Sequence, residues 1–588
     1  MTGGTDPYEV TPLPWPCDVE LLLPGSKSEA NRLLVAAALS GRAVTVTGAV
    51  PSDDVRHLVS GLATLGYDAR FLDEARGIVH VGPRAANPQD RGELFCGNAG
   101  TAVRFLVSVA AITPGQWTIT GDAAMQRRPI APLVAAWRQL GVEIEDSNGC
   151  PPVRVRGGAC RGGRVELDAS CSSQFVSSLL LVGAALPEGL DIRFAGSLAS
   201  VGYAQLTCTL LRQFGVVASL RDDGASVRRG SDMAPADVAV GADWSAMGVW
   251  TCLQHLTGFR VRASNLHAGS GQPDEQLDSV LHTLEGGGER TIDVSLLPDQ
   301  FLNLAITAAL RSGTTRLVGA ANLRHKECDR IAVMARELTR VGVPATELPD
   351  GLAIEGNRRL RPATIDPEND HRVAMAFALL GLLSPGITID DPGCVAKSYP
   401  LFWRDLEAVR ASRRCVAVVG MRGAGKSTFA EALARHTGGA WIDTDTEFER
   451  QHGPITAFVE RNGWTEFREH EARIVARSIA PGHIVSTGGG AVETPAVRKV
   501  LNADAEVVWL DGPVEVLRAR IRSDPRPRPS VTGQDVELEL ETLLVRRRSW
   551  YQEVCRVRID ISMPIAQQVE RALFELGRTC RFPHVPGA

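Results

Sequence analysis

The chain has 588 residues, and 44% of them are apolar. A chain of this length is too long for one hydrophobic core, so two or three domains are predicted. Its formal net charge of −5 produces no general basic field, so nucleic acid and anionic membranes are unfavourable partners and small molecules are expected. The 12 cysteines form no Cys-x-x-Cys pair, which argues against a zinc site or a disulfide framework.

The sequence shows no targeting or membrane signal. Its first residues, MTGGTDPYEV, lack a basic region followed by an apolar run. Nowhere does the chain reach the roughly 18 uninterrupted apolar residues of a membrane-spanning helix. Scattered cysteines also suit a reducing compartment. We therefore expect a cytoplasmic protein without membrane attachment.

Residues 1–408 alternate β-branched runs with Ala/Leu-rich amphipathic segments, which is typical of an α/β fold. Four segments combine a helix, a Gly-Val or Gly-Tyr pair and a strand: LATLGYDARF, WRQLGVEIED, LLRQFGVVASL and ELTRVGVPATEL. Glycine ends a helix well because it adopts the left-handed conformation without strain. The recurrence of this pattern predicts an internally repeated unit.

Residue types that bind anions recur through this part. The segment LPGSKSEANRLL places Lys27, Ser28 and Arg32 around the start of a predicted helix, although a solvated basic surface is the alternative for this motif alone. Further clusters follow in FCGNAGTAVRFL, MQRRPIAPL, SCSSQFVSSLLL, RHKECDRI, NDHRVAMAFALL and GCVAKSYP. So many clusters indicate substrates rich in phosphate and carboxylate groups.

Together, from about residue 15 to residue 408, these motifs resemble 5-enolpyruvylshikimate-3-phosphate synthase (EPSP synthase). The resemblance implies a two-lobed enolpyruvyl-transferase fold, with three copies of a βαβαββ unit in each lobe. The lobes would comprise about residues 24–241 and residues 1–23 plus 242–408, within a domain of residues 1–408. The active site would lie in the cleft between lobes that close on the substrates.

The same resemblance assigns residues to two substrates, without a cofactor. Those matched to shikimate 3-phosphate are Lys27, Ser28, Arg32, Ser172, Ser173, Gln174, Ser200, Asp299, Asn322 and Lys326. Those matched to phosphoenolpyruvate are Lys27, Gly100, Arg128, Arg330, Arg372 and Lys397. Two positions depart from the family pattern: Val201 and Gly202 replace a common Lys/Arg-Pro pair, and Phe105 stands where proline is common.

The implied chemistry removes a proton from the 5-hydroxyl group, protonates the enol carbon of phosphoenolpyruvate and expels phosphate. Asp299 and Glu327 are the acid/base candidates, with Lys27 as a third catalytic residue. Without the resemblance, Asp299 is equally a helix N-cap before FLNLAITAAL, and Glu327 a member of a surface ion pair.

A second pattern begins after EAVRASRRC at 407–415, with the buried-strand run CVAVVG, a glycine-rich loop and the predicted helix KSTFAEALARH. The loop at 420–427 fits G-x-x-x-x-G-K-S/T and predicts a nucleotide phosphate-binding loop. Its backbone N–H groups would face the phosphates, and the Ser427 hydroxyl would ligate Mg²⁺. The residues expected to bind ATP here are Gly423, Ala424, Gly425, Lys426, Ser427 and Thr428.

Two carboxylates, Asp443 and Asp445, follow the next predicted strand, where a helix N-cap is the alternative role. After them come GWTEFREHE, STGGGAVE and RSDPRPRPS. This ordered set of motifs, from about 414 to 580, resembles shikimate kinase. Its sequence is especially similar to that of the kinase module of the fungal pentafunctional arom proteins. The resemblance implies a P-loop, NMP-kinase-like parallel α/β domain over residues 414–588.

The residues that this second resemblance assigns to shikimate are Asp445, Arg468, Gly488, Gly489, Gly490 and Arg547. Asp445 would orient or deprotonate the accepting hydroxyl group, and Arg468 would pair with the carboxylate. Asp443 would join Ser427 in the Mg²⁺ shell.

Several arginines compete for roles in this part. The lid arginine over the phosphates is expected to be Arg528, with Arg526 as the alternative. Arg547 matches a shikimate-binding position, whereas its neighbours Arg546 and Arg548 are expected on a solvated helix face.

The sequence thus predicts a bifunctional shikimate-pathway enzyme whose partners are shikimate, ATP, shikimate 3-phosphate and phosphoenolpyruvate. One alternative makes the front part a UDP-N-acetylglucosamine enolpyruvyl transferase, but the matching region carries Arg128 and no cysteine. Another makes one part a regulatory module that has lost catalysis. The retention of Lys27, Asp299, Lys426 and Asp445 argues against it.

Overall fold

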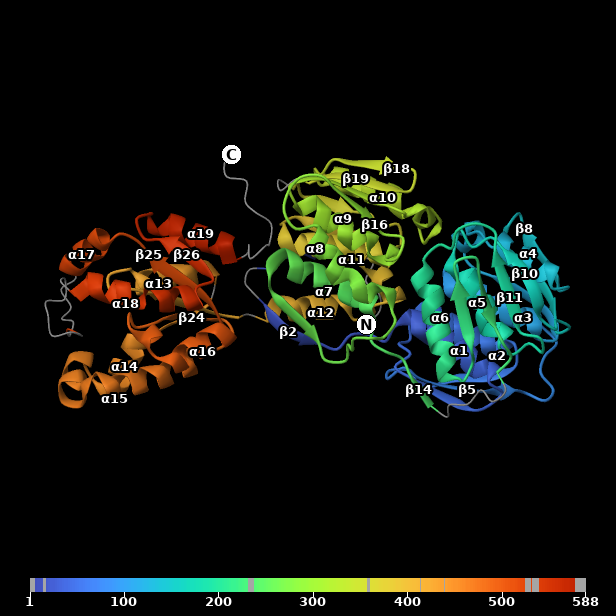
Figure 1. The fold of residues 1–588 in the computed structure, drawn as a ribbon, viewed down its shortest axis with the longest axis horizontal. Coiled ribbons are helices and arrows are strands. Elements are labelled where there is room, and N and C mark those ends of the chain that lie inside the picture. The colour runs from blue at the N-terminus through green and yellow to red at the C-terminus, as the bar shows by residue number, and fades with distance from the viewer. Residues whose placement is uncertain are drawn as a thin grey trace.

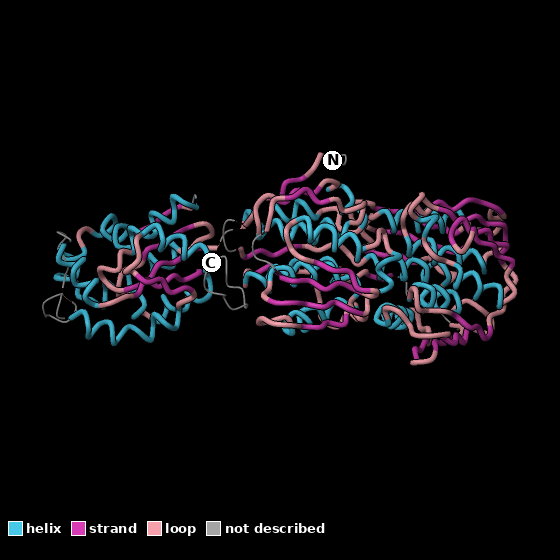
Figure 2. The backbone as a smooth tube through the Cα atoms, turned by 90° about the horizontal axis from the view of Figure 1, so that it is seen from above, coloured by secondary structure: helices cyan, strands magenta, loops and turns pink. Residues whose placement is uncertain are grey.

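The computed structural model describes residues 6–13, 17–230, 237–356, 360–412, 414–437, 439–523, 530 and 539–576. Figure 1 shows three bodies in a row, and the view from above in Figure 2 separates the last from the other two. The first lobe runs from α1 (Lys27–Leu39) to β14 (Asp237–Ala239). The second lobe comprises β1 (Tyr8–Val10), β2 (Asp18–Leu21) and the elements from α7 (Trp244–Thr257) to α12 (Phe402–Ala411). The C-terminal part runs from β22 (Cys415–Gly420) to α19 (Ile565–Leu576).

Three four-stranded sheets with one common strand order build the first lobe. One unit consists of β6 (Arg91–Phe95), α3 (Gly100–Ile112), β7 (Gly115–Thr120), α4 (Ala131–Gln139), β8 (Glu143–Ser147) and β9 (Cys150–Gly157). The next consists of β10 (Gly163–Leu167), α5 (Ser173–Gly183), β11 (Leu190–Phe194), α6 (Val201–Gln213), β12 (Ala218–Arg221) and β13 (Gly224–Val227). Both are βαβαββ units, in which the first two strands pair in parallel and the others antiparallel.

The third sheet of the first lobe is completed by a strand from later in the chain. Its strands are β3 (Val44–Thr47), β4 (Tyr67–Asp73) and β5 (Ile78–Arg84), and α2 (Asp53–Thr64) connects β3 to β4. Strand β14 pairs in parallel with β3 and forms the edge of this sheet. The lobe is therefore entered and left at the same sheet.

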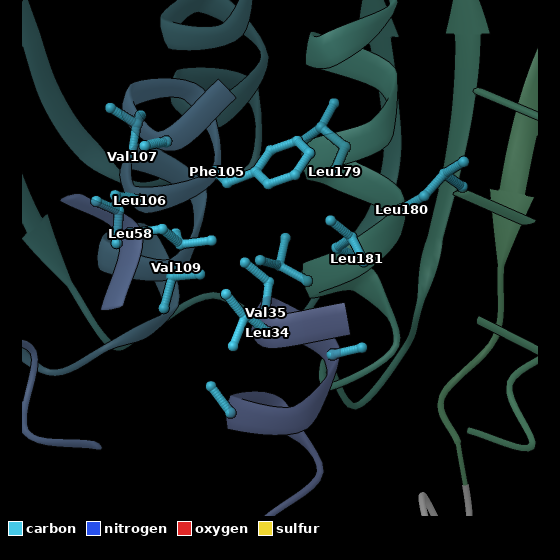
Figure 3. Packing of buried hydrophobic residues seen from close by; sticks show 14 of the residues in the cluster. Leu34, Val35, Leu58, Phe105, Leu106, Val107, Val109, Leu179, Leu180 and Leu181 are labelled. Atoms are coloured by element: carbon cyan, nitrogen blue, oxygen red, sulfur yellow. The ribbon is translucent and has the colours of Figure 1, made fainter. Parts of the chain in front are cut away.

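Helices α1, α3 and α5 form the centre of the first lobe. Every residue from Gly100 to Ala111 of α3 is buried, and α5 is nearly as enclosed. In Figure 3, Phe105 of α3 and Leu179 of α5 point toward one another, with Leu34 and Val35 of α1 close by. Helices that are apolar on all sides lie inside a domain, so only their ends remain for polar groups.

The second lobe has one four-stranded sheet of the same kind. Its βαβαββ unit consists of β16 (Arg290–Asp293), α9 (Phe301–Leu310), β17 (Gly313–Val318), α10 (Arg330–Arg340), β18 (Ala345–Leu348) and β19 (Gly351–Gly356). In the described residues the other two sheets are smaller. They consist of β1, β21 (Ile387–Ile389) and β20 (Ala363–Ile365) with α11 (His371–Leu383), and of β15 (Arg260–Ala263) and β2 with α7 and α8 (Leu277–Thr283).

The C-terminal part contains a parallel five-stranded sheet, as predicted. Its strand order is β23 (Ala440–Asp443), β24 (His483–Ser486), β22, β25 (Ala505–Asp511) and β26 (Val557–Asp560). The helices are α13 (Lys426–Thr437), α14 (Thr444–His452), α15 (Ile455–Ser478), α16 (Pro495–Asp504), α17 (Val514–Ser523), α18 (Glu539–Val554) and α19. Strand β22 is buried throughout because it is the central strand.

Only residues 412–414 separate α12 of the second lobe from β22 of the C-terminal part. Among the described helices, none combines the length and the apolarity that crossing a membrane requires.

Candidate active sites

A cavity between the two lobes collects the predicted front-part residues. Those that line it are Lys27, Ser28, Arg32, Gly100, Arg128, Ser172, Ser173, Gln174, Ser200, Asp299, Lys326, Glu327, Arg330 and Arg372. Asn322 lies next to the lining, since its side-chain amide donates to the Ser200 hydroxyl at 3.0 Å. Lys397 does not line the cavity itself but contacts Glu327, which does, and its Nζ lies 3.4 Å from Glu327 Oε1.

This cavity is narrow. Its volume of about 50 Å³ is far below the roughly 300–1,000 Å³ of common ligand pockets. The two lobes therefore lie close together around this cavity.

Helix N-termini surround the cavity. In the first lobe α1 begins at Lys27, α3 at Gly100 and α5 at Ser173. In the second lobe α10 begins at Arg330, and Arg372 is the second residue of α11. Unpaired backbone N–H groups and the positive ends of the helix dipoles favour anions at such a place. The N-termini of the core helices α1, α3 and α5 thus meet at one cavity that favours anions.

Arg32 is a buried cation that faces this cavity. Its guanidinium donates to Thr207 Oγ1 at 2.7 Å, to the Ser28 carbonyl at 2.8 Å and to Ser177 Oγ at 3.1 Å. None of the ion pairs found in the described residues involves it. Burial lowers the pKa of Arg32 to about 10 and that of Lys326 to about 8. Buried cations without a counter-ion are unfavourable, so the cavity is suited to an anionic ligand.

Asp299 is held by three donors. Its carboxylate accepts hydrogen bonds from the Tyr203 hydroxyl at 2.8 Å, Arg372 at 2.9 Å and Arg330 at 3.2 Å. Burial alone would raise the pKa of Asp299, but Arg372, Lys326 and Arg330 hold it well below its usual range. Its side chain does not cap α9, which begins after a 3-10 turn at Phe301. The N-cap alternative for Asp299 is therefore wrong.

Glu327 is likewise enclosed. It accepts a hydrogen bond from Arg330 at 3.0 Å and lies near Lys397, and only 9% of its side chain is exposed. Burial would raise its pKa, but Lys397, Arg330 and Arg128 hold the pKa of Glu327 well below its usual range. The surface ion-pair alternative for Glu327 is wrong too.

In the C-terminal part, the loop between β22 and α13 has the backbone of a phosphate-binding loop. Gly420, Gly423 and Gly425 have positive φ angles of 149°, 77° and 85°, which side chains other than glycine rarely adopt. Lys426 begins α13, and its ammonium group donates to the Met421 carbonyl at 3.1 Å. The other predicted ATP-binding residues of this loop, Ala424, Ser427 and Thr428, lie within two residues of Lys426.

Asp443 serves two neighbours at once. One carboxylate oxygen caps α14 by accepting the N–H groups of Asp445 and Thr446, each at 3.0 Å. The other accepts hydrogen bonds from Ser427 at 2.5 Å and Ser486 at 2.8 Å. A hydroxyl and a carboxylate so close together are hard oxygen donors of the kind that Mg²⁺ takes alongside nucleotide phosphates and water. The residues therefore fit the predicted magnesium ion.

Asp445 lies close to the predicted glycines. A Cβ atom added at Gly488 would collide with Glu471 and approach Asp445, and one at Gly490 would collide with the Arg468 guanidinium. Arg468 pairs with Glu471 at 2.5 Å. Desolvation, followed by the charge of Glu471, raises the pKa of Asp445 to about 6. Two carboxylates and an arginine thus lie together beside the glycines.

Arg547 also contacts the glycine loop. Its guanidinium pairs with Glu493 at 2.7 Å and donates to the Gly489 carbonyl at 3.3 Å, and its side chain is only 2% exposed. Its neighbours Arg546 and Arg548 have side chains 56% and 46% exposed, as expected for a solvated face.

The comparisons with known proteins agree with this geometry. Residues 16–406, more than half of the chain, match the family model described as EPSP synthase (3-phosphoshikimate 1-carboxyvinyltransferase). The chain belongs to the EPSP synthase family. Residues 422–576 match the shikimate kinase family model, so a synthase part and a kinase part follow one another. The predicted order of the two families is confirmed.

Relatives and solved structures support the same assignment. The pentafunctional AROM polypeptide of Scheffersomyces stipitis is 33% identical over 607 residues, which cover 90% of this chain and 38% of that protein. That of Candida tropicalis is 32% identical over 620 residues, with coverages of 93% and 40%. The chain thus spans about two fifths of the length of these relatives. The structure of EPSP synthase from Acinetobacter baumannii covers 69% of this chain and 98% of its own, with 24% identity and a TM-score of 0.57, which shows the shared fold.

Several residues in the synthase cavity were assigned to no substrate from the sequence. They include Thr101, Tyr203 and His371, together with Asp54, whose carboxylate lies 3.4 Å from Lys27 Nζ. Asp54 resembles any acidic residue in the first turn of a helix, so the sequence contains no signal for its role. Tyr203 follows Ser200 by three residues, but the motif does not reveal where its hydroxyl points.

The kinase part adds Glu471, Glu493 and Tyr551, whose hydroxyl donates to the Gly489 carbonyl at 2.6 Å. Glu471 belongs to the quoted motif GWTEFREHE, so its position three residues after Arg468 could have identified it as a helical ion-pair partner. Arg526 and Arg528, the two lid candidates, lie outside the described residues.

Proposed function

We propose that the chain is a bifunctional enzyme. The kinase part, residues 414–588, phosphorylates the 3-hydroxyl of shikimate with ATP. The synthase part, residues 1–408, transfers the enolpyruvyl group of phosphoenolpyruvate to the 5-hydroxyl of shikimate 3-phosphate and releases phosphate. Its lobes are residues 24–241 and residues 1–23 plus 242–408. The observation that carries this proposal is the coexistence of an anion cavity holding Asp299 and Glu327 with a complete phosphate-binding loop.

In the synthase part, the cavity receives two polyanions. Shikimate 3-phosphate binds Lys27, Ser28, Arg32, Ser172, Ser173, Gln174, Ser200, Asp299, Asn322 and Lys326. Phosphoenolpyruvate binds Lys27, Gly100, Arg128, Arg330, Arg372 and Lys397. The surplus of buried cations described above supports this assignment, because two such ligands supply the missing negative charge.

The transfer needs a base that acts on shikimate 3-phosphate and an acid that acts on phosphoenolpyruvate. Asp299 is ionised and accepts the proton of the 5-hydroxyl. Glu327 gives a proton to the enol carbon. Its own pKa is depressed by Lys397, Arg330 and Arg128, so an anionic substrate that neutralises these cations raises the pKa and lets Glu327 carry that proton. Lys27, at the positive end of α1, stabilises the phosphate that leaves the tetrahedral intermediate.

In the kinase part, Asp445 orients and deprotonates the accepting hydroxyl of shikimate, while Arg468 and Arg547 hold its carboxylate. Gly488, Gly489 and Gly490 leave room for the ring. Lys426 and the backbone of Gly423, Ala424, Gly425, Ser427 and Thr428 hold the ATP phosphates. The lid arginine assigned to them is Arg528, with Arg526 as the alternative. Mg²⁺, held by Ser427 and Asp443, neutralises phosphate charge when it is bound. The synthase part uses no cofactor, and the enzyme acts in the cytoplasm.

One incubation tests both activities. The full chain is mixed with shikimate, ATP, Mg²⁺ and phosphoenolpyruvate, and ADP, phosphate and the enolpyruvyl product are followed by mass spectrometry. All three products are expected. ADP without phosphate or enolpyruvyl product would contradict the synthase half, and no ADP would contradict the kinase half and favour a regulatory module.

A further inference from the structure

Tyr203, Asp274 and Asp299 form a chain of three oxygen atoms across the cleft. Tyr203 belongs to α6 of the first lobe, whereas Asp274 and Asp299 belong to 3-10 turns of the second lobe. The Tyr203 hydroxyl oxygen lies 3.0 Å from Asp274 Oδ2 and 2.8 Å from Asp299 Oδ2. Asp274 is 3% exposed and takes no part in the proposed binding of either substrate.

A phenol hydroxyl has one hydrogen, and an ionised carboxylate has none to donate. If both aspartates were ionised, they would share that single hydrogen, which weakens both hydrogen bonds, and two buried negative charges would meet at one hydroxyl. A proton on one of the aspartates removes this repulsion and gives each contact a hydrogen of its own. The geometry therefore favours one protonated aspartate.

The surroundings decide which aspartate carries it. Asp299 accepts hydrogen bonds from the charged groups of Arg372 and Arg330, which stabilise its ionised form. Among the described residues, the groups that donate to Asp274 on its other sides are neutral, the Gln300 amide at 3.0 Å and the Ser245 hydroxyl at 3.0 Å. The proton is thus far more stable on Asp274.

We propose that Asp274 is a protonated carboxylic acid in the resting site and acts as a positioning residue, donating to the Tyr203 oxygen so that the Tyr203 hydrogen points at Asp299. Tyr203 is then fixed at both sides and holds the proposed base in place while linking the two lobes. This inference rests on the proposed enolpyruvyl transfer for its effect on catalysis, but the protonation itself does not.

The charges around Asp274 agree with this state. Burial and then the negative charge of Asp299 raise the pKa of Asp274 to about 6, Asp243 adds to the rise, and Arg372 and the Gln300 hydrogen bond oppose it. Bound anionic substrates would raise it further. When Asp274 loses its proton to solvent at higher pH, two carboxylates compete for one hydroxyl hydrogen, and Asp299 loses its orienting donor.

The test compares three variants of the full chain by their pH–rate profiles with shikimate 3-phosphate and phosphoenolpyruvate. In the wild type, kcat/KM, which reports the ligand-free enzyme, should fall about tenfold per pH unit above the pKa of Asp274. In Asp274→Asn the amide still donates to Tyr203 but cannot ionise. The alkaline limb should therefore move by about two pH units, to that of Lys326, whose pKa burial lowers to about 8. Asp274→Leu and Tyr203→Phe, which lack a donor or the hydroxyl, should lose at least tenfold in kcat at every pH.

An unchanged alkaline limb in Asp274→Asn, or equal activity of the Asn and Leu variants, would overturn the proposal. A second measurement does not depend on activity. An acid whose pKa is raised in the folded state stabilises the fold at low pH and loses that contribution as the pH rises through the folded-state pKa. The wild type should therefore lose unfolding free energy relative to Asp274→Asn between pH 4 and about 6, measured on the urea transition of the synthase part. The transition of the kinase part serves as an internal reference.

If the wild type transferred no enolpyruvyl group, the proposed function would fail, and the unfolding data alone would decide whether Asp274 holds the proton. Parallel stability curves for the wild type and Asp274→Asn would overturn the inference even in an active enzyme.

Discussion

Arg414 contacts Asp18 across the junction between the two parts, with Nε 3.8 Å from Oδ2. On its other side the Arg414 guanidinium hydrogen-bonds to Glu506 of β25 and to the Ala503 carbonyl at 2.9 Å. Asp18 pairs in addition with Arg262 at 2.6 Å. A chain of charges thus connects strand β2 of the synthase part to the central sheet of the kinase part.

Replacement of Arg414 by methionine should destabilise the kinase part. Glu506 is 4% exposed and, of its two ion-pair partners in the described part of the chain, would keep Arg556, 3.1 Å away, so its desolvation is less well compensated. We expect a loss of about 2 kcal/mol in the free energy of unfolding of the kinase part. Urea unfolding of the full chain, with the two transitions resolved, measures it. Asp18→Asn is the matched control and should cost under about 1 kcal/mol, because Asp18 is more exposed. Equal effects of the two changes would contradict this view of the junction.

The two activities should be separable by single lysine changes. Lys426→Ala should lower phosphorylation of shikimate by at least about 10²-fold, because the charge at the transferred phosphate is lost. It should leave enolpyruvyl transfer from supplied shikimate 3-phosphate intact. Lys27→Ala should do the reverse. The chain has five lysines, and the one outside both sites, Lys499, is exposed on α16 and provides the control Lys499→Ala. Loss of both activities from one change in a folded protein would show that the sites are not independent.

The pH–rate profile of the kinase activity should have an acidic limb set by the ionisation of Asp445. The ionised form of Asp445 is the base, and its pKa is raised to about 6 by desolvation and then by Glu471. The kinase kcat/KM should therefore fall about tenfold per pH unit below this value. Glu471→Gln removes a neighbouring negative charge, which lowers the pKa of Asp445 and moves the limb to lower pH. Glu469, on the same helix with a side chain 63% exposed, is the control. A limb that stays in place in Glu471→Gln would rule out this coupling.

Gly490→Ala should weaken shikimate binding by a purely steric route. Gly490 has a φ angle of −106°, which alanine adopts without strain, but the added Cβ would collide with the Arg468 guanidinium. We expect the KM for shikimate to rise about tenfold or more while the KM for ATP changes little. Steady-state kinetics with each substrate varied in turn measures this. Gly287→Ala, whose Cβ would have no neighbour nearer than 3.7 Å, should be silent. A change in the KM for ATP alone would contradict the proposed place of shikimate.

Motifs whose functional groups are neighbours in the chain could be predicted without a structure. The phosphate-binding loop at 420–427 lies between a buried strand and a helix because local hydrogen bonding and glycine conformations suffice to form it. The repeated helix–Gly–strand segments likewise correspond to the βαβαββ units, since helix ends and strand alternation are local properties.

Whether an acidic residue is a cap, a surface group or part of a site was decided by the tertiary structure. Asp443 both caps α14 and holds Ser427, whereas Asp299 caps nothing and lies among arginines. In the sequence both are simply acids before a helix. Their difference comes from which charged groups the packing brings near, and those groups lie far away in the chain.

The same reason explains the residues that sequence reasoning missed. Tyr203 and Asp274 are separated by 71 positions and belong to different lobes, yet they share a hydrogen bond. No local pattern encodes a contact that exists only because two separately folded lobes face each other. The sequence determines which helices are apolar enough to be buried and which polar residues stand at their N-termini. The packing of the lobes determines which of those ends meet, and hence which carboxylates are held among cations and which retains a proton.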